Sequence, residues 1–245
     1  MMKNEIATHY NSVGDDYYSG WEKMTSGMKY IRKFEKDFVI DSLKDFKKSY
    51  STKVDLKALD VGCGPGRIAD FCMEVGGFSY HGLDISAEMV SAIKKRHGKN
   101  KAFVKADVCD TTGGLPYDSS YFDVATSIRV LKYNPEWKRI VSEVSRVLRP
   151  KGHFIFSIPN KYSLNVFSKG AIPIYKSSIS EITKVLEDNG FTDINIRESS
   201  KIPDPLYVLL PEKVVKVLML NVEKALAAVL GNKFSRLLYI SCVKK

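Results

Sequence analysis

Three glycines and one aspartate form the most chemically suggestive cluster of residues in this sequence. The segment ALDVGCGPG, residues 58–66, is a short apolar run that ends in glycines at positions 62, 64 and 66, with Asp60 two residues before the first of them. A strand, a glycine-rich turn and a helix start together form a ligand site. The exposed backbone N–H groups at such a turn favour a polar or anionic group, and the missing side chains allow it to come close.

The spacing of these glycines distinguishes two classes of ligand. A dinucleotide-binding turn has the pattern GxGxxG, and its third glycine would fall here on Arg67. The observed pattern is GxGxG, and the carboxylate of Asp60 would repel a pyrophosphate but attract an ammonium group. S-Adenosylmethionine carries an ammonium, a carboxylate and a sulfonium but no phosphate, so the loop favours this ligand over a dinucleotide.

Two further aspartates end the next two predicted strands. Asp84 closes the segment 79–85, and Asp107 closes the segment 102–108. Ligands of open parallel sheets bind at the carboxyl ends of the strands, so these side chains are expected at one edge. We expect Asp84 to accept hydrogen bonds from a ribose. We expect Asp107 to accept one from the amine of adenine, while the N–H of Val108 donates to a ring nitrogen.

Strand-like and helix-like segments alternate from residue 57 onward. The helix signals include Ser86 as an N-cap and Ser178 with Glu181 as a capping box. This alternation predicts parallel βαβ units in an α/β three-layer sandwich, with helices on both faces of one sheet. Strands are expected at residues 57–62, 79–85, 102–108, 122–128, 153–159, 193–199 and 236–244.

The rest of the chain is predicted to be helical. Residues 1–56 contain no strand pattern, and the apolar spacing in 27–46 suits an amphipathic helix, so this part is interpreted as an N-terminal helical cap or lid. Residues 57–245 form the sheet domain, with a helical insertion at 205–230 before the last strand.

The sequence resembles the class I S-adenosylmethionine-dependent methyltransferases of the small-molecule type, similar to quinone-biosynthesis methyltransferases. The resemblance rests on ALDVGCGPG, GLDISAEMV, VKADVCD, LPYDSSYFDVATSIRVLKY, EVSRVLRPKGHFIFSIPN and ITKVLEDNGF, which follow one another between about residues 56 and 200. It implies a Rossmann-like sheet of seven strands in the order 3-2-1-4-5-7-6, with strand 7 antiparallel. It also implies that S-adenosyl-L-methionine is the cofactor.

The resemblance implies a defined cofactor site. Met89 would pack against the adenine, although packing in the core is an equal alternative for a methionine. Ser127 and Ile128 would lie near the sulfonium. The full set of expected cofactor-binding residues is Asp60, Gly62, Cys63, Gly64, Gly66, Asp84, Ile85, Met89, Asp107, Val108, Ser127 and Ile128.

Methyl transfer from a sulfonium depends mainly on alignment and on exclusion of water. A general base is needed only for an acceptor that is still protonated at neutral pH. The segment THYNSVGDDYY resembles the tyrosine-bearing lid of related enzymes. Many relatives carry a histidine after the fourth strand, where this chain has Lys132 and Tyr133. The expected catalytic candidates are Tyr10, Tyr17, Tyr18, Arg129 and Tyr133. Arg32 is a candidate for the methionine carboxylate, with a surface role as the alternative.

The composition is that of an ordinary globular protein with a basic balance. The chain has 245 residues and a net charge of +10, and residues 201–245 carry eight Lys and Arg against three Asp and Glu. The four cysteines lack metal-site spacing, so free thiols and no metal are expected. No secretory signal or long apolar run is evident, so a cytoplasmic protein is expected.

The acceptor is predicted only by class. A small molecule, hydrophobic or glycosylated, is expected to be methylated on O or N. The residues TSIR follow the fourth strand where enzymes that methylate nucleic acid bases carry Asn/Asp-Pro-Pro-Tyr, so no specific nucleic acid is expected. Two partners stay open: an anionic membrane, which residues 201–245 would contact, and a second copy of the chain in a homodimer. The alternatives are a non-catalytic basic adaptor of the same fold that binds membrane or RNA, and a dinucleotide-dependent oxidoreductase.

Overall fold

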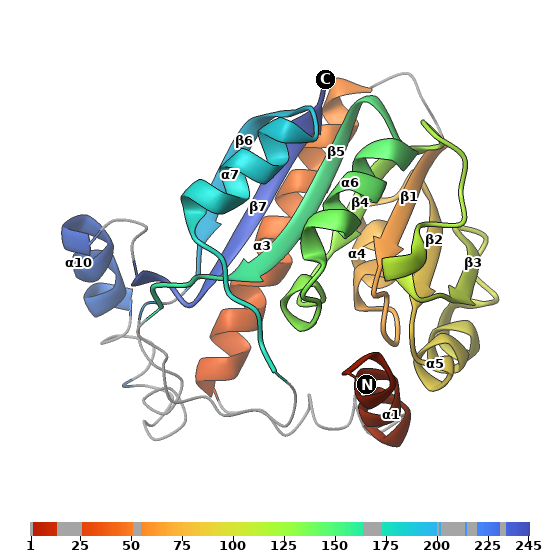
Figure 1. Cartoon of the computed structure of the whole chain (residues 1–245), viewed down its shortest axis with the longest axis horizontal. Helices are drawn as coiled ribbons and strands as arrows, with labels where there is room; N and C mark the ends of the chain where they lie inside the picture. The colour runs from red at the N-terminus through yellow and green to blue at the C-terminus, as the bar shows by residue number, and fades with distance from the viewer. Residues whose placement is uncertain are drawn as a thin grey trace.

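One mixed sheet forms the centre of the molecule (Figure 1). The computed structural model describes residues 2–13, 26–50, 55–163, 173–199, 201, 214, 220–230 and 234–245. The strands are β1 (Leu56–Val61), β2 (Phe78–Asp84), β3 (Phe103–Val108), β4 (Phe122–Ser127), β5 (Leu148–Pro159), β6 (Phe191–Glu198) and β7 (Leu237–Lys244). Their order is β3-β2-β1-β4-β5-β7-β6, and β7 is antiparallel to both of its neighbours. The predicted topology is therefore confirmed.

Helices cover both faces of this sheet, as the alternating pattern predicted. The α-helices of the described part are α1 (Met2–Val13), α3 (Ser26–Ser49), α4 (Arg67–Val75), α5 (Ala87–His97), α6 (Trp137–Val147), α7 (Ile179–Asp188) and α10 (Leu220–Leu230). Two short 3-10 helices, η1 (Thr111–Gly113) and η2 (Leu131–Tyr133), follow β3 and β4. Side chains of α6 and α7 share one core with the sheet, and side chains of α3, α4 and α5 share the other.

The alternation along β1 shows how the two cores arise. Leu59 and Val61 belong to the core under α6 and α7, whereas Leu56 and Ala58 belong to the core under α3, α4 and α5. Successive side chains of a strand point to opposite faces, so a strand that is buried on both faces is apolar throughout. Each large aliphatic side chain buried in this way contributes about 1.5–3 kcal/mol.

The predicted helix starts are found in the structure. The hydroxyl of Ser86 accepts a hydrogen bond from the N–H of Met89 at 3.2 Å, and Ser178 accepts one from Glu181 at 3.2 Å. The carboxylate of Glu181 contacts Lys138 of α6 at 2.8 Å, so this acid also ties α7 to α6.

The fifth strand begins earlier than predicted. The sequence pattern placed it at 153–159 and read RPKG, residues 149–152, as the exit of the preceding helix, but β5 already pairs with β4 at Leu148. The register shifts between Phe122 and Val124, and Lys151 has φ 64°. The residues RPKG are therefore accommodated by an irregularity in the pairing, and β5 continues through them.

Parts of the predicted cap and insertion lie outside the described residues. Tyr17 and Tyr18 are among them, as is most of 205–230 apart from Val214 and α10. The proposed boundary near residue 56 stays a prediction. In the described ranges, every helix is too short or too polar to cross a membrane.

Candidate functional site

A cavity of about 600 Å³ opens at the carboxyl ends of β1, β2 and β4. It lies where the strand order turns back, between β1 and β4, which is the usual ligand site of an open α/β sheet. Figure 1 shows α1 beyond the tips of these strands, and Ile6, His9 and Tyr10 of this helix line the cavity.

The three loop glycines serve different purposes. Gly62 has φ +80°, and a Cβ there would overlap the side chain of Val130. Gly66 has φ +99°, and a Cβ would lie 2.7 Å from Ile93 of α5, so this glycine allows packing rather than ligand contact. Gly64 has φ +50°, and a Cβ would meet nothing within 4 Å. Gly62 and Gly64 line the cavity, so the open space beside Gly64 is room for a ligand.

Asp84 fastens the glycine loop to the end of β2. Its Oδ2 atom accepts a hydrogen bond from the N–H of Gly64 at 2.8 Å, and its Oδ1 atom accepts one from Ser86 at 2.9 Å. Burial raises the pKa of Asp84, and these backbone hydrogen bonds partly offset the shift. Asp84 lines the cavity, and its carboxylate has about four acceptor sites, so the three backbone donors, which include Ile85, leave capacity for a ligand hydroxyl.

Asp60 lies beneath the loop, outside the described lining of the cavity. It is 1% exposed and accepts hydrogen bonds from Tyr80 Oη at 2.7 Å and Thr126 Oγ1 at 2.8 Å. Burial raises the pKa of Asp60 to about 6, although both hydrogen bonds oppose the shift. Because Asp60 lies outside the described lining, we expect it to act on a ligand mainly through its negative charge.

The other predicted cofactor residues divide into two groups. Cys63, Ile85, Met89 and Ile128 line the cavity together with Gly62, Gly64 and Asp84. Ser127 is fully buried and donates a hydrogen bond to the carbonyl of Val61 at 3.1 Å.

The predicted residues at the end of β3 lie outside the described lining of the cavity. Asp107 pairs with Lys105 at 3.1 Å, and Val108 is 57% exposed; neither belongs to the described lining. The residues that follow β3 line the cavity in their place, namely Cys109, Asp110, Thr111 and Thr112. Asp110 accepts hydrogen bonds from the N–H of Thr112 at 3.0 Å and from its hydroxyl at 2.6 Å, which fixes η1.

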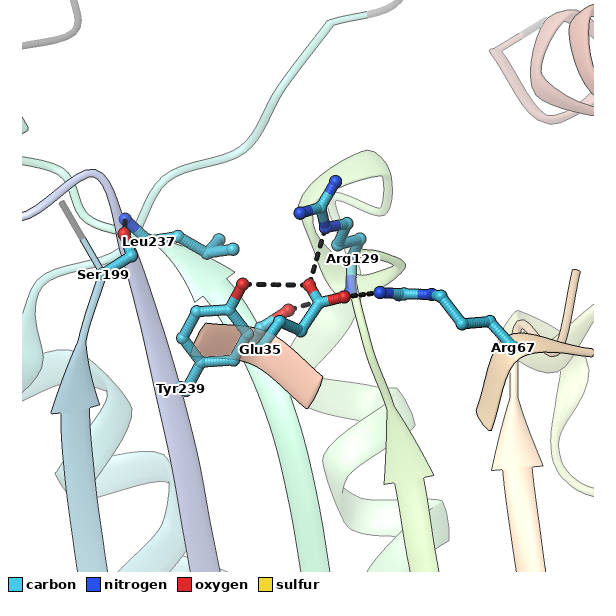
Figure 2. A network of polar contacts seen from close by, with 7 residues as sticks. Glu35, Arg67, Arg129, Ser199, Leu237 and Tyr239 are labelled. Atoms are coloured by element: carbon cyan, nitrogen blue, oxygen red, sulfur yellow. Dashed lines mark hydrogen bonds and ion pairs between the residues drawn. The ribbon is translucent and has the colours of Figure 1, made fainter. Parts of the chain in front are cut away.

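A buried glutamate that the sequence reasoning missed organises the opposite side of the cavity (Figure 2). Glu35 of α3 is fully buried and forms ion pairs with Arg67 and Arg129; its Oε2 atom lies 2.7 Å from Nε of Arg129. Tyr239 of β7 donates a hydrogen bond to the same oxygen at 2.9 Å. Arg67 and Arg129 both line the cavity. The available signal was the position of Glu35 on the apolar stripe of the predicted helix.

Two tyrosines and a lysine line the cavity where η2 faces α1. The rings of Tyr10 and Tyr133 lie 6.0 Å apart in an edge-on arrangement, and Nζ of Lys132 lies 4.5 Å from the ring centre of Tyr133. Burial lowers the pKa of Lys132. Burial alone would raise the pKa of Tyr133, but the charge of Lys132 and hydrogen bonds with Tyr10 and Lys132 outweigh it and lower this pKa. All three residues line the cavity.

The candidate Arg32 and two of the histidines lie elsewhere. Arg32 is half-buried on α3 and is outside the described lining of the cavity. His81 packs against Phe122, and His153 packs against Phe46 with ring centres 4.7 Å apart.

Comparison with known proteins shows what this architecture is related to. Residues 59–156 match the family described as a methyltransferase domain. The chain is 35% identical over 112 residues to a phthiotriol/phenolphthiotriol dimycocerosates methyltransferase of Mycobacterium tuberculosis, a match that covers 44% of this chain and 40% of that protein. It is 30% identical over 165 residues to sterol 4-C-methyltransferase strm-1 of Caenorhabditis elegans, covering 62% of this chain and 46% of that protein. The chain thus spans less than half the length of these curated relatives.

Longer matches have lower identity. An uncharacterized protein of Methanocaldococcus jannaschii is 25% identical over 237 residues, covering 94% of this chain and 98% of its own. Magnesium protoporphyrin IX methyltransferase from Synechocystis PCC 6803 superposes over 100% of both chains with a TM-score of 0.67 and 18% identity. Phosphoethanolamine N-methyltransferase 2 of Haemonchus contortus superposes over 83% of this chain and 52% of its own, with a TM-score of 0.60 and 19% identity. Residues 59–156 thus match the methyltransferase domain family, and the whole chain has the seven-stranded fold of the methyltransferases it superposes on.

Proposed function

We propose that the cavity binds S-adenosylmethionine and directs its methyl group to an O or N atom of a small-molecule acceptor. One observation carries this proposal: the open space beside Gly64 and the carboxylate of Asp84 meet in one cavity at the switch point of the sheet. A backbone without side chains and a carboxylate with unused lone pairs are what an adenosyl group with a ribose requires.

The residues of the first three strands fit the parts of this cofactor. Asp84 would accept the ribose hydroxyls, and Met89, which is 1% exposed at the cavity, would pack against the adenine. The buried charge of Asp60 below the loop favours the ammonium end. Asp107 and Val108 stay our predicted contacts for the adenine edge, with Asp110 as a further polar group in the lining.

The opposite side of the cavity would receive the acceptor. When bound, the cofactor supplies a methyl group that is already activated by the sulfonium. The chain therefore has to orient the acceptor and exclude water, which can supply much of the acceleration. Ile6, Val130 and Ile140 give this side an apolar surface that suits a hydrophobic or glycosylated acceptor, and α1 covers it.

Titration calorimetry with S-adenosylmethionine, S-adenosylhomocysteine and NADH tests the cofactor. We expect about micromolar affinity for the first two ligands and loss of binding in Asp84→Ala. Asp188→Ala, on the exposed surface of α7, is the matched control and should bind as the wild type does. Binding of NADH alone would favour the oxidoreductase alternative. Failure to bind any of the three would favour the adaptor.

A screen of labelled methyl transfer into cell extract then addresses the acceptor. Label in small molecules that depends on Asp84 would support the proposal, whereas label in RNA or protein would redirect it to another class of acceptor.

We also propose that the basic residues of 201–245 let the protein contact an anionic membrane. Support comes from α10, where Val222 and Val229 are 39% and 81% exposed. Sedimentation with phosphatidylserine vesicles should exceed sedimentation with phosphatidylcholine vesicles and should weaken with salt. Equal sedimentation with both would contradict this role.

A further inference from the structure

We propose that Tyr133, supported by Lys132 and Tyr10, takes the proton from a hydroxyl group of the acceptor, so that this chain methylates oxygen. The inference rests on the proposed methyl transfer and narrows it from O or N to O.

The geometry brings an ionisable group, a cation and a second phenol to one place in the cavity. Tyr133 and Lys132 are neighbours in η2, and Tyr10 comes from α1. The ring of Tyr10 meets that of Tyr133 at 6.0 Å and 69°, and Nζ of Lys132 stands 4.5 Å from the centre of the Tyr133 ring. The carbonyl of Lys132 accepts a hydrogen bond from the N–H of Tyr175 at 2.7 Å, which holds η2 in place.

The charges around Tyr133 favour an oxyanion over an ammonium. The positive charge of Arg129 lowers the pKa of Tyr133, and the charges of Arg129 and Arg236 contribute to lowering the pKa of Lys132. The ionisable groups around this position come from α1, the loop after β4, and the residues just before α6 and β7. They are His9, Tyr10, Arg129, Lys132, Glu136 and Arg236. Arg129 is also paired with the buried Glu35. Counting this acid, the cations Arg129, Lys132 and Arg236 outnumber Glu35 and Glu136, so a protonated amine is repelled from this end of the cavity, whereas a hydroxyl that loses its proton is stabilised.

A second tyrosine, Tyr117, shows that burial near a lysine does not by itself lower the pKa of a phenol. Tyr117 is also half-buried and has Nζ of Lys105 at 4.9 Å from its ring centre, yet burial and the charge of Asp107 raise its pKa. At Tyr133 the pKa is lowered despite burial, and the pKa of Lys132 is lowered as well. Tyr133 and Lys132 interact and therefore titrate as a pair. Because the pKa of each is lowered, the pair releases its first proton more easily.

The proposed step couples transfer of a proton to transfer of the methyl group. The hydroxyl of the acceptor gives its proton to the phenolate oxygen of Tyr133, while the acceptor oxygen forms a bond to the methyl carbon. The bond between that carbon and sulfur breaks, and its electron pair stays on sulfur as a neutral thioether. Tyr133 then releases the proton to water, which restores the phenolate.

The first test is a spectrophotometric titration of tyrosinate in the whole chain, without ligand. We expect the wild type to show one phenol that ionises below the pH range of the others, and Tyr133→Phe to lack this step. Tyr162→Phe removes a 55% exposed tyrosine outside the described lining, and it should leave the early step unchanged. An early step that persists in Tyr133→Phe, or that is missing from the wild type, overturns the proposal.

The second test separates a chemical role from a structural one. Lys132→Met should move the early step to higher pH, together with the acidic limb of the pH profile for methyl transfer into extract. The control Lys138→Met changes an exposed lysine of α6 and should move neither. Lys132→Met also keeps the proposal testable if thermal unfolding shows that Tyr133→Phe does not fold.

The third test distinguishes failure of this proposal from failure of the cofactor proposal. Tyr133→Phe should lower methyl transfer by roughly 10²–10⁴-fold while binding S-adenosylhomocysteine like the wild type. Normal binding with undiminished transfer, or with label on nitrogen, overturns the role of Tyr133 alone. If the wild type itself does not bind S-adenosylhomocysteine, the cofactor proposal is overturned.

Discussion

The two sides of the cavity are built in different ways. The glycine side, which we define as Gly62, Gly64 and Asp84, is held by hydrogen bonds from the backbone N–H groups of the loop. Gly62 donates to the carbonyl of Leu83 at 2.7 Å, and Gly64 donates to the carboxylate of Asp84 at 2.8 Å. The arginine side, which we define as Arg67 and Arg129 with Glu35, depends on side chains from distant segments. Tyr239, which donates to Glu35, is 204 positions away from it in the sequence. A local backbone site can be recognised in the sequence, whereas a site made by long-range side-chain contacts cannot.

The largest effect should come from removing the centre of the arginine side. Glu35→Gln leaves two arginines beside a fully buried neutral group, so we expect it to lower the free energy of unfolding by about 3–5 kcal/mol. Urea unfolding measures this change.

Asp37→Asn, on the exposed surface of the same helix, removes the ion pair with Lys33 and should cost less than about 0.5 kcal/mol. If the two variants were equally stable, the contacts of Glu35 would not be what holds this side together.

The glycine side can be altered at two positions with different outcomes. Gly62→Ala combines a positive φ with overlap onto Val130, so we expect a loss of about 2–4 kcal/mol in unfolding free energy. Gly64→Ala has a positive φ but meets nothing within 4 Å, so about 1–2 kcal/mol is expected.

Binding should separate these two variants further. The methyl group of Gly64→Ala projects toward the ligand space, so calorimetry should show weaker S-adenosylmethionine binding in a variant that remains largely folded. Wild-type affinity in Gly64→Ala would mean that the ligand does not lie against the loop.

The buried charge under the glycine side predicts a pH dependence. Asp60 has a folded-state pKa of about 6 against an ordinary 3.8, so between these values the folded chain keeps a proton that the unfolded chain has lost. This group therefore lowers stability as pH rises through that window, by about 3 kcal/mol in total. Asp60→Asn should lack this contribution, which is measured as the difference between the two unfolding curves at pH 4 and pH 7. Parallel curves for the two proteins would rule out the raised pKa.

The smallest effect should come from the third strand. If Asp107 accepts from the adenine amine, as the sequence predicts, Asp107→Ala should weaken S-adenosylmethionine binding by roughly 2–10-fold, which corresponds to one hydrogen bond. Asp110→Ala tests the other acid of this region, which lies in the cavity and fixes η1. A larger loss in Asp110→Ala than in Asp107→Ala would move the adenine contact to the loop after β3.

Sequence reasoning anticipated the strands and the glycine loop because they depend on local patterns of apolar residues, caps and turns, whereas the strand order came from the resemblance to a known family. It missed the early start of β5, since RPKG has turn residues that an irregular strand also accepts. It named Tyr133 and Arg129 but missed Lys132, Glu35 and the role of Arg67, because a buried charge becomes meaningful only when its partners are known. It placed the adenine edge at the last residues of β3, which stays a prediction, and it did not name the residues after β3 that line the cavity, because a pattern does not show how far a cavity extends into the following loop.

The contact between Tyr239 and Glu35 has a consequence for synthesis. Since β7 is the last strand to leave the ribosome, a nascent chain can assemble the glycine side well before the hydroxyl that anchors Glu35 is available. Ordering of the two arginines is thereby deferred until this strand inserts between β5 and β6. A ribosome-bound intermediate lacking β7 would then have an ordered glycine side facing an arginine side that is not yet organised.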